Sequence, residues 1–290
     1  MKLPKFEYQA PTTLSEAIAL LEAADGEAKL LSGGQSLMPM LAFRMATPTM
    51  LVDLRKVRGL DAIVVDDTVR LGARVRWCDI EKDERLRTGH PLLQEAIRHV
   101  AHYQIRNRGT VGGSMAHADP AAEFPAVAVS CEAEISTVSA TGSRVIAASD
   151  FFVAPLFTVL EPDEIITEVS FPKWSPTRRF GFQEFSRRRG DFAIAGAIVH
   201  YDMDASGRMA DVHVGAFGLG NTPIRLEEAE ALLNGQAPSV DHFEQIAAAA
   251  MKDVEIQDDI HADAEYRRSL LQTMLMRALQ SSLGSGVWSS

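Results

Sequence analysis

Apolar positions at the start of the chain alternate between helical and extended spacing. Over residues 14–21 they recur at i, i+3, i+4 and i+7, which predicts an amphipathic helix. Thr13 and Glu16 form a capping-box signal at its start. Short apolar runs at 29–31 and 50–54 predict two buried strands. A glycine-rich loop directly follows the first of these strands, at the end where open α/β sheets bind ligands.

The pattern changes near residue 60, where period-two alternation and turn residues become frequent. The arrangement of apolar and turn residues from here on predicts two β-hairpins, two helices and one further strand before a proline-rich break. The predicted hairpins span 62–73 and 134–147, the helices span 91–100 and 121–129, and the strand spans 164–171. Pro172 and Pro176 bracket polar residues, which is typical of a domain boundary.

Three strands and then two helices are predicted beyond this boundary. The strands span 180–186, 194–203 and 209–217, and the helices span 239–251 and 263–282. Strands followed by helices favour an antiparallel sheet with helices on one face, an α+β arrangement. The chain therefore divides into three predicted units, 1–58, 59–174 and 177–290.

Composition and charge disfavour several classes of function. The chain has 290 residues with 46% apolar content, enough for about two domains with a substantial core. Its net charge is −10 and its basic residues are scattered, which disfavours nucleic acid as a main partner. We find no apolar run long enough for a signal peptide or a membrane span, so a cytoplasmic protein is expected.

Cysteine and histidine usage disfavours a metal centre on this chain. Cys78 and Cys131 are the only cysteines, and they are interpreted as small buried hydrophobic residues. An iron–sulfur cluster normally takes four protein ligands, mostly cysteine, so this chain alone is not expected to hold one. His99 and His102 have a spacing of i, i+3 on a predicted helix, but no further ligand completes a site, and we predict no metal.

Two glycine-rich segments about 80 residues apart carry the clearest chemistry, 30–37 (LLSGGQSL) and 106–114 (RNRGTVGGS). Adjacent glycines beside small hydroxyl residues let bare backbone N–H groups approach an anion. Two such loops predict a long ligand with a phosphate-bearing middle. Each loop taken alone is equally well explained as a structural turn. Neither matches G-x-G-x-x-G or the P-loop, and no lysine follows either glycine pair, which disfavours an NTPase.

Two further segments are candidates for the same ligand. Asp119 or Glu123 could accept hydrogen bonds from sugar hydroxyls, as acidic residues do in dinucleotide sites, although a helix cap and an exposed acid explain them as well. The run Arg187–Phe192 is either a solvated turn or a loop that returns to the cofactor with Phe192 against a ring.

Together these segments resemble one known family. The resemblance lies in 32–39 and 106–114, in Ala118-Asp119-Pro120, in 188–193 and in the late motif 258–268. This pattern resembles the FAD-binding medium subunits of molybdenum hydroxylases, which include the carbon monoxide dehydrogenase medium subunit. It is also similar to the flavin domain of xanthine dehydrogenase. The resemblance covers residues 3–282.

The family implies a fold, a cofactor and partners. The implied fold is a two-part FAD-binding domain of the vanillyl-alcohol-oxidase type with a smaller C-terminal α+β domain. FAD is expected to be non-covalent. The expected partners are a large molybdenum-cofactor subunit and a small subunit with two [2Fe–2S] clusters, assembled as a dimer of heterotrimers. Electrons would pass from the clusters to FAD and then to an external acceptor, so no acid–base catalytic residue is expected.

The resemblance also implies the residues that contact FAD. The first loop would hold the pyrophosphate and ribityl region, the second loop would face it, Glu123 would contact a ribose or ribityl hydroxyl, and two apolar side chains would lie near the isoalloxazine. The implied residues are Lys29, Leu30, Leu31, Ser32, Gly33, Gly34, Gln35, Ser36, Leu37, Gly109, Thr110, Gly112, Gly113, Ser114, Glu123, Ile166 and Phe192.

Two alternatives belong to other classes. A self-sufficient flavin oxidoreductase of the same fold would need an acid–base pair near the ring, and no clear candidate is visible in the sequence. A cofactor-free interaction module would be expected to have lost glycine at Gly33 or Gly113, and both glycines are present.

Overall fold

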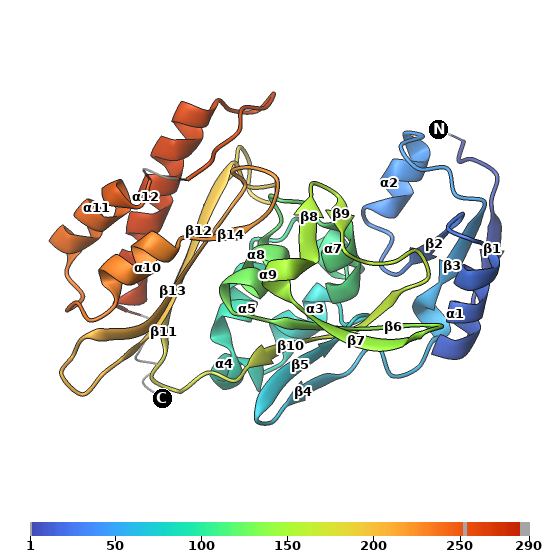
Figure 1. Cartoon of the computed structure of the whole chain (residues 1–290), viewed down its shortest axis with the longest axis horizontal. Coiled ribbons are helices and arrows are strands. Elements are labelled where there is room, and N and C mark those ends of the chain that lie inside the picture. The colour runs from blue at the N-terminus through green and yellow to red at the C-terminus, as the bar shows by residue number, and fades with distance from the viewer. Residues whose placement is uncertain (1, 252–253, 285–290) are drawn as a thin grey trace.

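The described chain forms two α+β bodies that lie side by side (Figure 1). A computed structural model describes residues 2–251 and 254–284. Within these residues the strands form a three-stranded sheet, a five-stranded sheet, a four-stranded sheet and a two-stranded hairpin. The first two sheets and their helices make up the first body, and the four-stranded sheet with the last helices makes up the second.

The three-stranded sheet is parallel, with the order β1-β3-β2. The predicted strands at 29–31 and 50–54 are confirmed as β2 and β3, and the predicted first helix is α1. Thr13 Oγ1 accepts from the N–H of Glu16 at 3.2 Å and caps this helix. The elements are β1 Glu7–Gln9, α1 Leu14–Ala23, β2 Ala28–Leu31, α2 Leu37–Ala42, β3 Met50–Asp53 and the short 3-10 helix Leu54–Lys56.

The five-stranded sheet is antiparallel, with the order β4-β5-β10-β6-β7. Both predicted hairpins and the strand before Pro172 are present, and the predicted helices are α5 and α8. The strands are β4 Ile63–Val65, β5 Thr68–Gly72, β6 Glu134–Ser139, β7 Gly142–Ala147 and β10 Ile165–Pro172, with a small hairpin β8 Phe152–Ala154 and β9 Phe157–Thr158. The helices are α3 Trp77–Lys82, α4 Leu86–Gly89, α5 Pro91–Ile97, α6 Tyr103–Arg106, α7 Val111–His117, α8 Glu123–Ser130 and α9 Ala148–Phe151.

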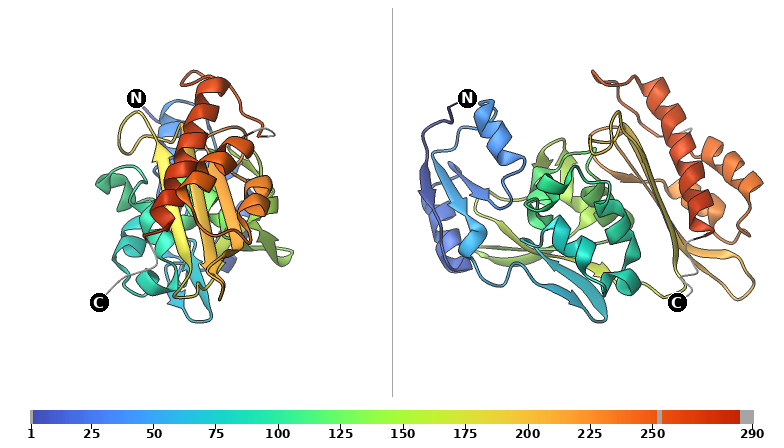
Figure 2. Two further views of the ribbon diagram at one scale, coloured as in Figure 1. Left: turned by 90° about the vertical axis from the view of Figure 1, so that its left-hand side faces the viewer. Right: turned by 180° about the vertical axis from the view of Figure 1, so that it is seen from behind.

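The four-stranded sheet is antiparallel, with the order β11-β12-β13-β14, and helices cover one of its faces (Figure 2). This confirms the predicted C-terminal arrangement, although β14 and α10 were not predicted. The elements are β11 Arg179–Phe185, β12 Ala195–Met203, β13 Met209–Phe217, β14 Ile224–Arg225, α10 Glu227–Leu233, α11 Val240–Ala249 and α12 Ala264–Ser282.

The opposite face of this sheet packs on α8 of the first body. Phe182, Ile198 and Phe217 project from that face and belong to the same buried cluster as the helices of the first body. The other side of the sheet has its own cluster with α12, centred on residues such as Tyr201 and Leu275. The two bodies therefore share one apolar core across their junction.

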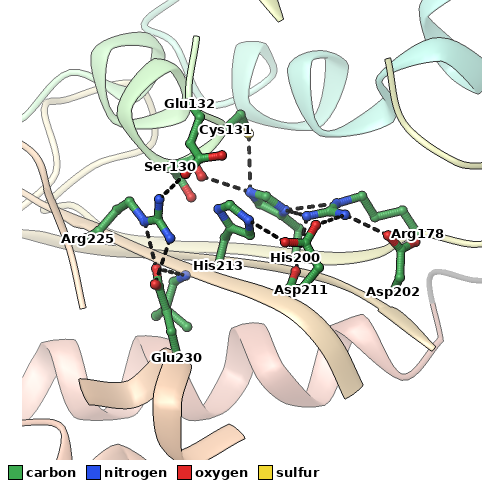
Figure 3. Close-up of polar contacts among 11 residues, drawn as sticks. Ser130, Cys131, Glu132, Arg178, His200, Asp202, Asp211, His213, Arg225 and Glu230 are labelled. Atoms are coloured by element: carbon green, nitrogen blue, oxygen red, sulfur yellow. Dashed lines mark hydrogen bonds and ion pairs between the residues drawn. The ribbon is translucent and has the colours of Figure 1, made fainter. Parts of the chain in front are cut away.

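A polar network fastens the same junction (Figure 3). The Arg178 guanidinium donates to Nδ1 of His200 at 2.8 and 3.0 Å and pairs with Asp202 and Asp211. Because Nδ1 accepts, Nε2 carries the hydrogen, and it lies 3.0 Å from the carbonyl oxygen of Ser130 at the end of α8. Burial, followed by the Arg178 charge, holds the pKa of His200 well below its usual value, so this link is made by a neutral imidazole.

Candidate functional site

The first glycine loop lies at the carboxyl end of β2, as predicted. The backbone N–H groups of residues 33–37 make no hydrogen bond to any other part of the described chain. Gly34 has a φ of +72°, a left-handed conformation that glycine adopts without strain. The loop is only half-buried. Five consecutive N–H groups without a partner, in a partly exposed turn, are donors that suit a phosphate or pyrophosphate.

The second glycine segment touches the first. Ser32 Oγ lies 2.9 Å from Thr110 Oγ1, although the two residues are 78 positions apart. Gly33 is needed for this approach, because a Cβ there would lie 2.1 Å from the carbonyl oxygen of Arg108. The sequence predicted two loops acting on one ligand, and the structure brings them into direct contact.

The second segment differs from expectation in its conformation. Gly112 and Gly113 lie in the first turn of α7, which Thr110 caps through its side chain. The N–H groups of Val111 and Gly112 donate to the carbonyl oxygens of residues 75 and 73 at 3.0 and 2.8 Å. The expectation of bare N–H groups at these two positions is therefore wrong. Gly112 instead permits close packing, since a Cβ would lie 2.7 Å from that of Ala73.

Glu123 begins α8 and is 4% exposed. Burial, followed by the charge of Glu184, raises its pKa to about 8, so the carboxyl is largely protonated at neutral pH. In that form it can donate a hydrogen bond as well as accept one. The sequence singled out this position, but not its neighbour Glu184 on β11.

His99 bridges the two bodies beside Glu184. Its Nδ1 lies 3.3 Å from Glu184 Oε1, and its Nε2 lies 3.9 Å from Glu95 Oε1. Burial alone would lower the pKa of His99, but hydrogen bonds to the two carboxylates outweigh it and raise the pKa to about 9. The expectation that His99 and His102 share one helix is wrong, because α5 ends at Ile97 and His102 is the N-cap residue of α6. No signal in the sequence joined His99 to a residue 85 positions away.

The arginine-rich loop between β11 and β12 returns to the first body. A Cβ on Gly190 would lie 2.7 Å from the carbonyl oxygen of Ala101 and from the His102 ring. Phe192 on this loop is 57% exposed, whereas Ile166 on β10 is buried in the shared core. Their predicted places near the isoalloxazine stay predictions.

The late motif 258–268 holds the ends of two strands together. Arg267 is 5% exposed and donates to the carbonyl oxygen of Ile194, before β12, at 2.7 Å, and to that of Gly218, after β13. Asp259 pairs with it at 2.6 Å. This motif therefore fixes the strand ends at the junction, next to the arginine-rich loop.

Known families match both parts of the chain. Residues 4–174 match the FAD binding domain in molybdopterin dehydrogenase, and residues 180–282 match the CO dehydrogenase flavoprotein C-terminal domain. No helix among the described residues is long and apolar enough to cross a membrane.

Individual proteins match over nearly the whole chain. The nicotine 6-hydroxylase medium subunit of Paenarthrobacter nicotinovorans is 39% identical, covering 96% of this chain and 98% of that protein. The alpha subunit of the 6-hydroxypseudooxynicotine dehydrogenase complex from the same organism is 37% identical, covering 98% and 96%. A solved structure of carbon monoxide dehydrogenase from Hydrogenophaga pseudoflava superposes with a TM-score of 0.94 at 34% identity, covering 98% of this chain and 99% of that one.

The fold and the two family matches define a flavoprotein with an FAD-binding domain and a C-terminal antiparallel domain. More narrowly, the chain belongs to the family of FAD-binding medium subunits of molybdenum hydroxylases and dehydrogenases. The resemblance inferred from the sequence is confirmed, and the protein is an oxidoreductase subunit with FAD as its cofactor.

Proposed function

We propose that this chain is the electron-transfer subunit of a three-part complex in the cytoplasm. It takes electrons from [2Fe–2S] clusters on a small subunit, holds them on non-covalent FAD and passes them to an external acceptor. A large subunit with the molybdenum cofactor hydroxylates the substrate, and the complex is a dimer of heterotrimers. The observation that carries the proposal is the run of five free N–H groups in residues 33–37.

Each group of candidate residues is assigned to one part of FAD. The first loop, residues 29–37, would bind the pyrophosphate through the N–H groups of residues 33–37, because these five donors have no other described partner. The second segment, residues 109–114, would support that loop and offer the hydroxyls of Thr110 and Ser114. Glu123 would bond a ribose or ribityl hydroxyl, with Ile166 and Phe192 beside the ring.

The two cysteines of this chain bear on which subunit holds the iron–sulfur clusters. Bound FAD supplies the exchange between one-electron and two-electron carriers. Cys78 and Cys131 are both buried as free thiols, and burial raises the pKa of each. Buried, protonated thiols are poor cluster ligands, and two fall short of the four that a cluster requires. The iron–sulfur clusters are therefore assigned to a partner.

A second candidate is a self-sufficient flavin oxidoreductase, which would need acid–base groups near the ring. The His99–Glu184–Glu123 cluster is the one observation in its favour. Turnover of a simple donor–acceptor pair by the isolated chain would support it. The subunit proposal requires that such turnover be absent or slow compared with that of the assembled complex.

The first experiment is an absorption spectrum of the full chain expressed alone, followed by acid precipitation and chromatography of the released chromophore. We expect FAD in the supernatant and no iron–sulfur absorption. A well-folded, colourless protein that also fails to take up added FAD would overturn the proposal. For the partners, purification of the native protein should bring molybdenum and iron with it.

A further inference from the structure

The hairpin formed by β8 and β9 leaves several large apolar side chains exposed at one place. Val153 is 54% exposed, Leu156 is 42% exposed and Phe157 is 63% exposed. A single exposed apolar residue needs no explanation, whereas several close together mark a contact surface for another molecule. We refer to residues 152–158 as the apolar hairpin.

The backbone of Leu156 supports this interpretation. Leu156 lies in the turn of the apolar hairpin with a φ of +62°, a left-handed conformation that glycine or asparagine adopts with less strain. Its side chain is only partly covered, so packing within the described chain gives little reason for a leucine at this position. A leucine there is explained if a partner buries its side chain.

The apolar hairpin is attached to the helix that carries the second glycine segment. The N–H of Leu156 donates to the carbonyl oxygen of Ala118 at 3.0 Å, and Ala118 is the C-cap of α7, beside which the hairpin lies (Figure 1). The N-cap of α7 is Thr110, which contacts Ser32 of the first loop. A helix of this length spans about 10 Å. A protein bound to the apolar hairpin would therefore lie close to both glycine-rich loops.

A groove beside the apolar hairpin extends to the second body. Its volume is about 440 Å³. Phe152 and Val153 line it from the first body, and Leu219, Ile224 and Leu226 line it from the second. An apolar side chain of a partner that entered this groove would be enclosed by both bodies, as the anchor residues of protein interfaces are.

The unpaired charges around the groove are negative. Glu227, Glu228 and Glu255 line it, are exposed and form no ion pair with a described residue. Arg225 also lines the groove, but it already pairs with Glu230 at 2.7 Å. A partner segment with lysine or arginine beside its apolar residues would complement this surface. A second copy of this chain, with a net charge of −10, would be repelled by it.

We propose that the apolar hairpin and the adjoining groove form the docking site of the iron–sulfur subunit, which places there an apolar segment flanked by lysine or arginine. The inference rests on the proposed function, in which the cluster-bearing subunit is the one that must come close to FAD. The attachment of the hairpin to α7 favours that subunit over the large one, because a protein bound there lies beside the helix of the second glycine segment.

The first test is photo-crosslinking in the assembled complex. The full chain, tagged and expressed in its native host, carries benzoylphenylalanine in place of Phe157, and mass spectrometry identifies the crosslinked protein. We expect a chain with enough cysteines to hold two [2Fe–2S] clusters. The same probe in place of Val240, which is 48% exposed at the start of α11, should not crosslink to that chain. A crosslink from Phe157 to the molybdenum subunit or to a second copy of this chain would overturn the inference.

The second test compares Val153→Arg with Val240→Arg, the same substitution at a similarly exposed valine away from the hairpin. Val153→Arg places a positive charge in the apolar surface, so the iron that co-purifies per FAD should fall by about tenfold or more. Val240→Arg should keep the wild-type ratio, and both variants should keep their FAD.

The outcomes separate the two proposals. A wild type that brings FAD but neither iron nor molybdenum would overturn the proposed function and this inference with it. A wild type that brings iron, with the same ratio in Val153→Arg, would overturn this inference alone. If Val153→Arg fails to bind FAD, the crosslink from position 157 decides.

Discussion

Single glycines decide how closely the two loops approach. Gly33 faces the carbonyl oxygen of Arg108, and Gly112 faces Ala73, so each leaves room for neighbouring backbone or side chain. Only Gly34, among the glycines of these two loops, needs its left-handed φ. The sequence marked these residues as contacts for a ligand, but several of them act first on the protein itself.

Gly33→Ala should disrupt the contact between the loops. Its Cβ would lie 2.1 Å from Arg108 O, so one loop must move, at a cost of about 1–3 kcal/mol in the free energy of unfolding. FAD affinity should fall by about tenfold or more, since that corresponds to only about 1.4 kcal/mol. Denaturant titration and FAD fluorescence measure the two effects.

Gly220→Ala is the control for that variant. The nearest atom to its added Cβ would be 3.7 Å away, an ordinary contact. Its stability and FAD affinity should match those of the wild type. Equal FAD affinity in Gly33→Ala and Gly220→Ala would show that the contact between the loops does not support cofactor binding.

At the scale of elements, the spacing of apolar residues was sufficient to predict a helix or strand wherever that element buries one face. The strands β5, β10, β12 and β13 and the helices α1 and α12 follow directly from apolar spacing. The short helix α7 does not, because two adjacent glycines disfavour a helix. Tertiary partners override this preference: Thr110 caps the helix, and residues 73 and 75 accept its first N–H groups.

The contact between His99 and Glu184 could not be predicted from sequence patterns, for a related reason. Glu184 faces His99 because β11 pairs with β12 in one register and lays that face on the first body. Neither fact is encoded within a few residues of either side chain. The two glycine-rich loops could be located from the sequence because each carries its own local signature.

Thr110→Val should weaken α7 and the cofactor site together. It removes the cap to Gly113 and leaves Ser32 without its hydroxyl partner, while keeping the shape of the side chain. We expect a loss of about 1–2 kcal/mol in the free energy of unfolding and weaker FAD binding. Thr13→Val removes the equivalent cap of α1, far from the loops, and should lower stability with FAD affinity unchanged. Equal FAD affinity in the two variants would contradict the supporting role of Thr110.

At the scale of the whole molecule, the junction contains neutral histidines. His90 stacks on Trp174 with ring centroids 4.1 Å apart, and Trp174 in turn packs on His200. Neither nitrogen of His90 has a partner elsewhere in the described chain. Burial lowers the pKa of His90 to about 3. Protonation of either ring would place an uncompensated charge between the two bodies.

This arrangement predicts acid sensitivity. An unfolded histidine has a pKa near 6.5, so the contribution of His90 is fully present above that pH and is lost as the pH falls toward about 3. At about pH 5 the loss is on the order of 2 kcal/mol. His90→Phe keeps the stacking and cannot be protonated, so its unfolding free energy should exceed that of the wild type increasingly below pH 6.5.

Two other groups act in the opposite direction and are unchanged by His90→Phe. The raised pKa of His99 gives stability that is complete below about 6.5 and is lost toward about 9. The raised pKa of Glu123 likewise gives the folded state stability that is lost as the pH rises toward about 8. The difference between wild type and variant in denaturant titrations therefore isolates His90. A difference that stays constant from neutral to acidic pH would contradict the prediction.

The contact between Ser32 and Thr110 has a consequence for the order of events during synthesis. The ribosome releases the first loop long before Arg108 and Thr110, the residues that Gly33 and Ser32 pack against, have been made. Glu184 follows later still, and Arg267, which holds the ends of β12 and β13 together, emerges after both. A nascent chain can therefore bring its two glycine-rich loops together only after residue 110 has left the ribosome, so the first loop waits for most of the first body to be synthesised.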